Sequence, residues 1–109
     1  MIPERGQIIW LNFNPQKGHE QAGRRPALVI SPAAYNGVSS CVLVCPITSN
    51  TTPWPWKVML PKDEKITGAV LVDQLKSIDP KARKTEDSEQ TVPSSIMHEV
   101  LARLATLTG

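Results

Sequence analysis

Residues 41–47 read Cys-Val-Leu-Val-Cys-Pro-Ile, the most apolar run of this 109-residue chain. Short runs rich in β-branched residues are typical of strands. On a strand, at about 3.3 Å per residue, the Cα atoms of Cys41 and Cys45 lie about 13 Å apart, whereas a disulfide needs about 7 Å or less. The run therefore predicts a strand that carries two small buried thiols on one face.

Other runs of the same kind lie on either side of this strand. They predict further strands at residues 7–13, 26–31, 57–60 and 69–72, with a weaker candidate at 76–79. Ten prolines and six glycines punctuate the chain, and no helical pattern intervenes between the strands. Five or six closely spaced strands favour a small antiparallel β-barrel or sandwich over a parallel α/β fold.

The last part of the chain has a helical period instead. Pro93 stands where a helix would begin, since proline is common in the first turn. We expect one amphipathic helix of about 14 residues, which covers the barrel or meets a second copy of itself. Its apolar stripe consists of Ile96, Met97, Val100, Leu101, Leu104 and Leu107. Residues 1–109 are predicted to form a single domain.

The composition is that of an ordinary globular protein, with 40% apolar residues, 20% charged residues and a net charge of +2. So small a charge does not by itself indicate a nucleic-acid partner. No apolar run approaches the ~18 residues of a membrane span, and the first residues lack a signal-peptide pattern. We therefore expect a cytoplasmic protein without membrane contact. The two histidines, His19 and His98, are scattered, so no metal site is expected.

A polar segment separates the first two predicted strands. Residues 17–26 read Lys-Gly-His-Glu-Gln-Ala-Gly-Arg-Arg-Pro. The whole connection spans about 12 residues, which is long for a hairpin, and loops of this length are often functional. Glu20 and Arg25 lie at either end of the bend and could converge on one bound group. The alternative is a solvated hairpin tip, in which they form a surface ion pair worth under about 1 kcal/mol.

Two further polar clusters follow the ends of predicted strands. Thr48 begins a run rich in hydroxyl residues directly after the most apolar strand, where such side chains either bind a ligand or satisfy turn backbone. Asp73 and Gln74 end a later strand, and four cations follow in the nine residues from Lys76. A charge run is usually a solvated face, but these polar groups begin at the junction of two strands.

Two motifs in these segments resemble the MazF/PemK family of toxin endoribonucleases, the mRNA interferases. Residues 20–26 follow the pattern E-Q-x-G-x-R-P, and residues 73–77 follow D-Q-x-K-S. The likeness runs nearly end to end, through residues 6–10, 13–15, 18–32, 35–36, 44–48 and 68–78 and the closing helix.

The resemblance implies a mainly β protein, a small SH3-like antiparallel β-barrel of the CcdB/PemK type with a C-terminal α-helix. It also implies a homodimer that cleaves single-stranded mRNA sequence-specifically without a metal or other cofactor, as the toxin of a type II toxin-antitoxin system. A cognate MazE-like antitoxin would neutralise it by laying an acidic tail across the active groove. The family's catalytic Arg and Thr fall on Arg25 and Thr48, and a Glu that contributes in some members falls on Glu20.

These residue types suit the implied reaction. Without a metal, RNA is cut when its own 2′-hydroxyl attacks the adjacent phosphate. Glu20 is the candidate base for this hydroxyl. Arg25 can donate two hydrogen bonds to the phosphate, and Thr48 can donate one more, as an oxyanion-hole donor does. The sequence leaves open which group protonates the leaving 5′-oxygen.

Further residues are candidates for holding and reading the RNA. Cations contact phosphates, polar side chains read base edges, and an indole ring can stack on a base for about 1–3 kcal/mol. The alternative for an indole here is that it covers one end of the barrel. The candidates are Lys17, Arg24, Lys76 and Arg83 for phosphates, Asn36, Asp73, Gln74 and Ser77 for polar contacts, and Trp54 for stacking.

Two other functions fit the same predicted fold. The gyrase-inhibiting branch of the superfamily shares its barrel and dimer but acts through the end of its C-terminal helix, which includes a tryptophan. The present chain ends Leu-Ala-Thr-Leu-Thr-Gly, without an aromatic residue. An adaptor that binds proline-rich peptides would need a groove lined by several aromatics, and only 5% of this chain is aromatic.

Overall fold

The computed structural model describes residues 1–13 and 23–109. The strands are β1 (Gln7–Phe13), β2 (Gly23–Val29), β3 (Val42–Thr48), β4 (Lys57–Met59), β5 (Ala69–Leu71), β6 (Lys76–Ile78) and β7 (Glu86–Thr91). The helices are α1 (Ala33–Asn36), the 3₁₀ turn η1 (Val72–Gln74) and α2 (Ser94–Thr108). The five expected strands, the weaker sixth candidate and the closing helix are all confirmed, with shifts of up to three residues at their ends.

Strand β3, the apolar run, organises the sheet because it pairs with three other strands. Along one edge it pairs with β2, from Val29 opposite Val44 to Ala27 opposite Pro46. It also pairs with β6 near its start, at residues 42–44, and with β5 near its end, at residues 47–48. Pro46 has no N–H to donate to a ladder. Between β5 and β6 the chain leaves the ladder and forms η1.

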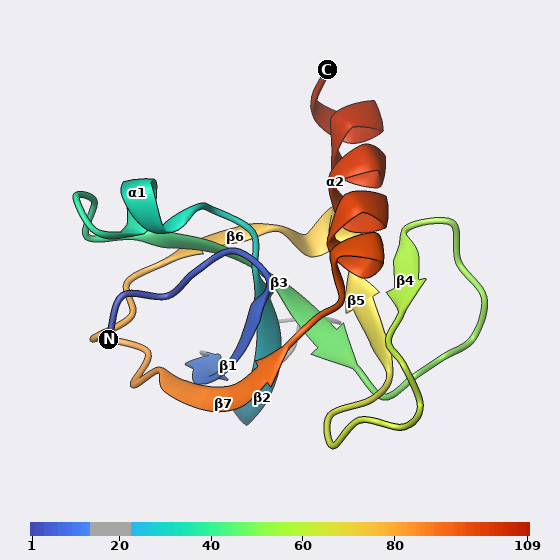
Figure 1. Ribbon diagram of the computed structural model, residues 1–109, viewed down its shortest axis with the longest axis horizontal. Coiled ribbons are helices and arrows are strands. Elements are labelled where there is room, and N and C mark those ends of the chain that lie inside the picture. Colours follow the sequence, from blue (N-terminus) through green and yellow to red (C-terminus); the bar gives the residue numbers. More distant parts are fainter. Residues whose placement is uncertain (14–22) are drawn as a thin grey trace.

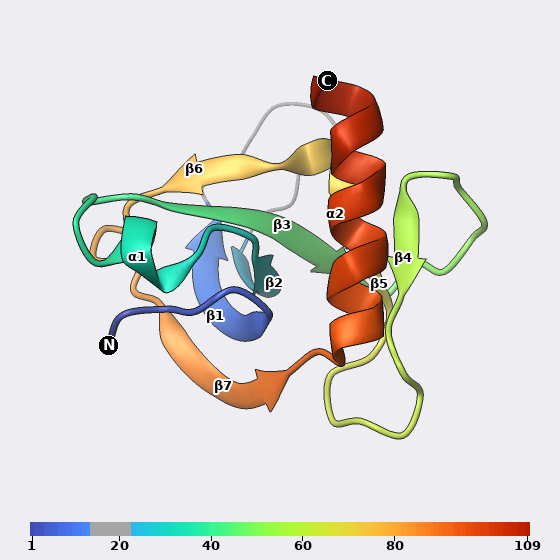
Figure 2. The same ribbon diagram turned by 45° about the horizontal axis from the view of Figure 1, so that its top comes forward.

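All strand pairs are antiparallel, and the sheet has the order β4-β5-β3-β2-β1-β7, with β6 joined to β3. Figures 1 and 2 show the sheet strongly curved, with β7 and β4 at opposite ends. Among the described residues these two end strands do not pair, so the sheet is not closed. The mainly β class with a C-terminal helix is confirmed, whereas the expected barrel is an open, curved sheet.

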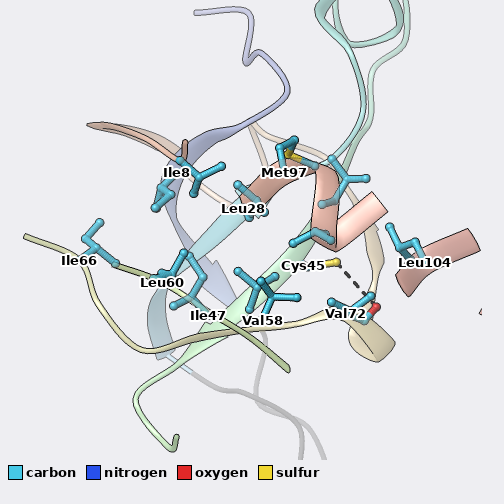
Figure 3. Close-up of a cluster of buried hydrophobic side chains, with 14 residues drawn as sticks. Ile8, Leu28, Cys45, Ile47, Val58, Leu60, Ile66, Val72, Met97 and Leu104 are labelled. Atoms are coloured by element: carbon cyan, nitrogen blue, oxygen red, sulfur yellow. Dashed lines mark hydrogen bonds between the residues drawn. The ribbon is translucent and has the colours of Figure 1, made fainter. Parts of the chain in front are cut away.

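Alternate residues of the central strands pack into two separate hydrophobic clusters, as the two-residue period of a strand requires. Ile8, Leu28 and Cys45 belong to the larger cluster, which Figure 3 shows in close-up. Their neighbours Ile9, Val29 and Val44 belong to a smaller one. Because both faces are covered, these strands appear in the sequence as nearly continuous apolar runs.

Helix α2 covers the larger cluster with the predicted apolar stripe. Met97, Val100 and Leu104 are buried there, and Ile96 and Leu101 pack at its border. Leu107, predicted to continue the stripe, is exposed. Figures 1 and 2 show why, because the last turns of α2 extend past the strands. None of the helices in the described part of the chain is both long and apolar enough to cross a membrane.

Strand β7 was not predicted, and its residues explain why. It reads Glu-Asp-Ser-Glu-Gln-Thr and pairs only with β1, through a register shift between Ile8 and Ile9. Its one buried residue is Gln90, whose side-chain amide accepts a hydrogen bond from the Ile66 N–H (2.9 Å) and donates one to the Ile66 carbonyl (3.0 Å). Polar burial of this kind leaves no hydrophobic pattern in the sequence.

Both cysteines are free, but their surroundings differ. The Cys45 thiol is fully buried and donates to the Val72 carbonyl, and burial, aided by the negative charge of Asp73, raises its pKa to about 12. Because the thiolate is the reactive form, we expect iodoacetamide to modify half-buried Cys41 at least about 10²-fold faster than Cys45 in the folded protein. Peptide mass spectrometry measures both rates, with the denatured protein as control. Equal rates in the folded protein would contradict this burial.

Candidate active site

Arg25 and Thr48 lie where β2 and β3 stop pairing. Ala27 lies opposite Pro46, and Arg25 and Thr48 are each two residues beyond this pair on their own strands. At that point Arg25 pairs with Leu11 of β1, and Thr48 pairs with Ala69 of β5. The two strands therefore diverge, each toward its other neighbour, and leave a gap between them.

The alternation along the strands places both side chains on the same face of the sheet. Ala27, Val29 and Val44 belong to the smaller cluster. Arg25 lies two residues before Ala27 on β2, and Thr48 lies four residues after Val44 on β3. Both therefore alternate to the face of the sheet that carries this cluster. The Thr48 hydroxyl accepts a hydrogen bond from the Asn50 N–H (3.1 Å), which leaves its own proton able to donate elsewhere. Arg25 is exposed and Thr48 is half-buried.

A pocket of about 400 Å³ occupies the gap. Its walls come from β1, β2, the end of β3, the β4–β5 loop and β7. They consist of Trp10, Arg24, Arg25, Pro26, Ile47, Thr48, Ser49, Lys65, Ile66, Thr67 and Ser88. The structure thus brings together the predicted catalytic residues Arg25 and Thr48 from distant parts of the sequence.

The cations of the pocket differ in their surroundings. Arg24, predicted to contact phosphate, forms an ion pair with Glu86 (2.8 Å) and donates to Asn12 Oδ1 and to the Lys84 carbonyl (both 3.0 Å). These contacts tie the start of β2 to β1 and β7, so Arg24 supports its neighbour Arg25. Lys65 is exposed in the β4–β5 loop, and no ion pair to it occurs within residues 1–13 and 23–109.

Trp54 and Asp73 form a second group outside the pocket. The Trp54 indole N–H donates to Asp73 Oδ2 (3.2 Å), and Trp54 as a residue is 50% exposed. Asp73 follows Val72 in η1, and the Val72 carbonyl accepts a hydrogen bond from the Cys45 thiol (3.8 Å). Cys45 precedes Thr48 by three residues of an extended strand, a span of about 10 Å. Trp54 and Asp73 are not among the described residues that line the pocket.

The other residues of the D-Q-x-K-S motif, and Arg83, are also absent from the described lining of the pocket. Gln74 ends η1, and its side-chain Oε1 is buried with no hydrogen-bond partner in the described structure. Lys76 and Ser77 belong to β6, opposite Val44 and Leu43. Arg83 is half-buried in the turn before β7, where its carbonyl accepts from the Asn12 N–H (2.8 Å).

Asn36 has a structural place in the fold. It is 7% exposed at the end of α1, and its side-chain NH₂ donates to the carbonyls of Pro3 and Ser31. Its Oδ1 accepts from the Ser31 hydroxyl. Because both amide protons and the oxygen are engaged internally, we correct the prediction that Asn36 reads base edges and assign it to holding the N-terminal segment.

Two predicted site residues, Lys17 and Glu20, lie outside the described residues. Within the described ranges no three His, Cys, Asp or Glu side chains cluster closely enough to hold a metal ion.

Sequence analysis missed Trp10, Lys65, Thr67 and Ser88 as pocket residues. Trp10 was counted only as a strand residue, and the others stand in polar segments that no motif marks.

Comparisons with known proteins show the family to which the chain belongs. A profile of the PemK-like, MazF-like toxins of type II toxin-antitoxin systems matches residues 4–108. The endoribonuclease toxin MazF of Escherichia coli strain K12 is 37% identical over 108 residues, covering 99% of this chain and 96% of that protein. The crystal structure of MazF (Form-I) from Deinococcus radiodurans superposes with a TM-score of 0.91 at 45% identity, covering 100% of this chain and 98% of the other.

A MazE-MazF crystal structure (Form-II) from Deinococcus radiodurans is also similar, with a TM-score of 0.88 at 45% identity and coverage of 100% of this chain and 97% of the other. The chain belongs to the PemK-like, MazF-like toxin family of type II toxin-antitoxin systems. The family suggested by the two sequence motifs is thereby confirmed.

Gly68 sets the position of Thr48 and provides a test of this geometry. Its φ is +110°, and a Cβ there would lie 2.2 Å from the Thr48 carbonyl oxygen. We expect Gly68→Ala to lower the free energy of unfolding by about 2 kcal/mol or more, because it adds a backbone clash to the strain of a positive φ. Urea denaturation measures the change.

Gly23→Ala is the matched control for Gly68→Ala. Gly23 also has a positive φ, +79°, but a Cβ there would meet no atom of residues 1–13 or 23–109 within 4 Å. Only the conformational strain should remain, about 1 kcal/mol. Equal losses in the two variants would show that the close approach of Gly68 to Thr48 does not constrain the site.

Proposed function

We propose that this toxin endoribonuclease cleaves single-stranded RNA by attack of the RNA's own 2′-hydroxyl on the adjacent phosphate, with that phosphate bound between Arg25 and Thr48. The observation that carries the proposal is the convergence of a guanidinium and a hydroxyl at the divergence of β2 and β3. The pocket of about 400 Å³ has room for one phosphate and its flanking sugars.

Each group has one task in this mechanism. The Arg25 guanidinium donates two hydrogen bonds to the nonbridging phosphate oxygens and neutralises charge that grows as the fifth bond to phosphorus forms. The Thr48 hydroxyl donates a third hydrogen bond. Glu20 takes the proton of the 2′-hydroxyl, as in family members that use a Glu at this motif position. The products are a 2′,3′-cyclic phosphate and a 5′-hydroxyl end.

The remaining predicted contacts serve to hold the RNA on either side of the cut. Trp54 supplies a half-exposed ring for stacking, and Asp73 beside it supplies a carboxylate that can accept from base amino groups. Lys17, Lys76 and Arg83 serve as phosphate contacts, with Gln74 and Ser77 as polar contacts on the same side as Asp73. We further propose that the enzyme works as a homodimer in the cytoplasm, where its mRNA substrates are.

Arg25→Ala should abolish cleavage of a long RNA that the unchanged protein cuts in excess EDTA, because the phosphate loses its bidentate donor. Thr48→Val should slow cleavage by about 10²–10³-fold, whereas Thr48→Ser, which keeps the hydroxyl, should retain most activity. End mapping of the products measures both the rate and the chemistry. A DNA copy should bind without being cut, since it lacks the nucleophile. Undiminished cleavage by a folded Arg25→Ala variant would refute the mechanism.

A MazE-like antitoxin is the proposed protein partner, supported by the MazE-MazF complex to which the chain is similar. An acidic, extended antitoxin segment would lie across the pocket, where Arg25 and Lys65 are exposed. Such a segment would compete with RNA, because both bring negative charge to the same cations.

The affinity for the cognate antitoxin should fall as the salt concentration rises, and Arg25→Ala should weaken the complex while the protein stays folded. Titration calorimetry at several salt concentrations measures this dependence. RNA cleavage measured in the same mixtures should stop as the antitoxin binds. A saturated complex that still cuts RNA at the original rate would rule out a shared surface.

A further inference from the structure

The proposed mechanism lacks a group that protonates the leaving 5′-oxygen, and one side chain among the described residues of the pocket is suited to it. Thr67 and Ser49 offer only neutral hydroxyls, which are weak acids. The Ser88 hydroxyl already donates to the Ile8 carbonyl. The Arg24 guanidinium is held by Glu86 and by Asn12. Among the described residues that line the pocket, Lys65 is the one further cation apart from Arg24 and Arg25, and a lysine ammonium is a donor with three N–H groups.

The backbone that carries Lys65 is fixed despite its place in a loop. The next residue, Ile66, is buried in the larger cluster, and Gln90 binds both its N–H and its carbonyl. At its base, the loop is closed by the Leu60 N–H, which donates to the Gly68 carbonyl (2.9 Å). These two buried hydrogen bonds satisfy both backbone groups of Ile66 and hold the residue that follows Lys65 in place.

The same loop is tied to the catalytic threonine. It leads directly into β5, whose first residue, Ala69, pairs with Thr48, and Gly68 packs against the Thr48 carbonyl. Lys65 and Thr48 are therefore held on elements that are joined to each other, and both line the pocket. A flexible four-carbon side chain on a fixed backbone can reach across a pocket of this size.

Building on the proposed cleavage, we propose that Lys65 is a further catalytic residue, the acid that protonates the leaving 5′-oxygen, and that Gln90 positions it. As the 2′-oxygen bonds to phosphorus, the bond from phosphorus to the 5′-oxygen breaks and its electron pair goes to that oxygen. A proton passes from the Lys65 ammonium to the same oxygen and gives the 5′-hydroxyl product. The neutral amine then regains a proton from water, while the base releases to water the proton taken from the 2′-hydroxyl.

A leaving group that needs no proton distinguishes this role from simple binding. Lys65→Met should slow cleavage of ordinary RNA by about 10²–10⁴-fold, the usual contribution of general acid catalysis. The same variant should cut an RNA with sulfur in place of the bridging 5′-oxygen at nearly the unchanged rate, because a thiolate leaves without protonation. Lys65→Arg, which keeps the charge but is a far weaker acid, should behave like Lys65→Met on both substrates.

Lys62→Met is the matched control, since Lys62 is exposed in the same loop but does not line the pocket. It should cut both substrates normally. Gln90→Leu should slow the ordinary substrate more than the sulfur substrate, a difference that mere loss of stability would not produce.

The outcomes separate this inference from the proposed function. If the unchanged protein cuts ordinary RNA in EDTA and Lys65→Met cuts it equally fast, Lys65 is not the acid although the proposed function stands. An equal slowing on both substrates, or recovery with Lys65→Arg, would also overturn the inference. Absence of cleavage by the unchanged protein would instead refute the proposed function.

Discussion

The change of partner along β3 is the constraint on which the rest of the structure depends. An apolar strand buried on both faces must satisfy its backbone groups through its neighbours, and Pro46 supplies no N–H to do so. Around Pro46 the ladder passes from β6 to β5 on one edge and ends against β2 on the other. The strands beyond this point diverge, and the pocket lies in the space between them.

The position of the pocket also accounts for its polarity. Beyond the end of the β2–β3 ladder, no strand in the described part of the chain separates the two faces of the sheet. Side chains from both faces therefore line the same pocket. Arg25 and Thr48 extend the period of the smaller cluster, and Trp10 borders the larger one. The acidic strand β7 neutralises Arg24 through Glu86 and holds the Lys65 loop through Gln90. The cations Arg25 and Lys65 thus face the pocket from separately anchored elements.

The sequence predicted what depends on local pattern or on a motif. Strand β3 follows from its continuous apolar run and helix α2 from its apolar period, and Arg25 and Thr48 follow from the family likeness. Strand β7 escaped because its buried residue is a glutamine, whose partner, Ile66, is far away in the sequence. Asn36 was misassigned because an asparagine in a polar segment looks the same whether it binds a ligand or its own backbone. Lys65 carries no sequence signal, since only tertiary contacts bring its loop to the pocket.

The central claim is that one phosphate is bound by both strands at their divergence. A crystal structure with an RNA that carries a 2′-deoxy sugar at the cut site tests it most directly, because this RNA binds without reacting. The account predicts that the Arg25 guanidinium and the Thr48 hydroxyl both lie within about 3 Å of nonbridging oxygens of the same phosphate. A scissile phosphate bound by only one of them, or held outside the gap between β2 and β3, would contradict it.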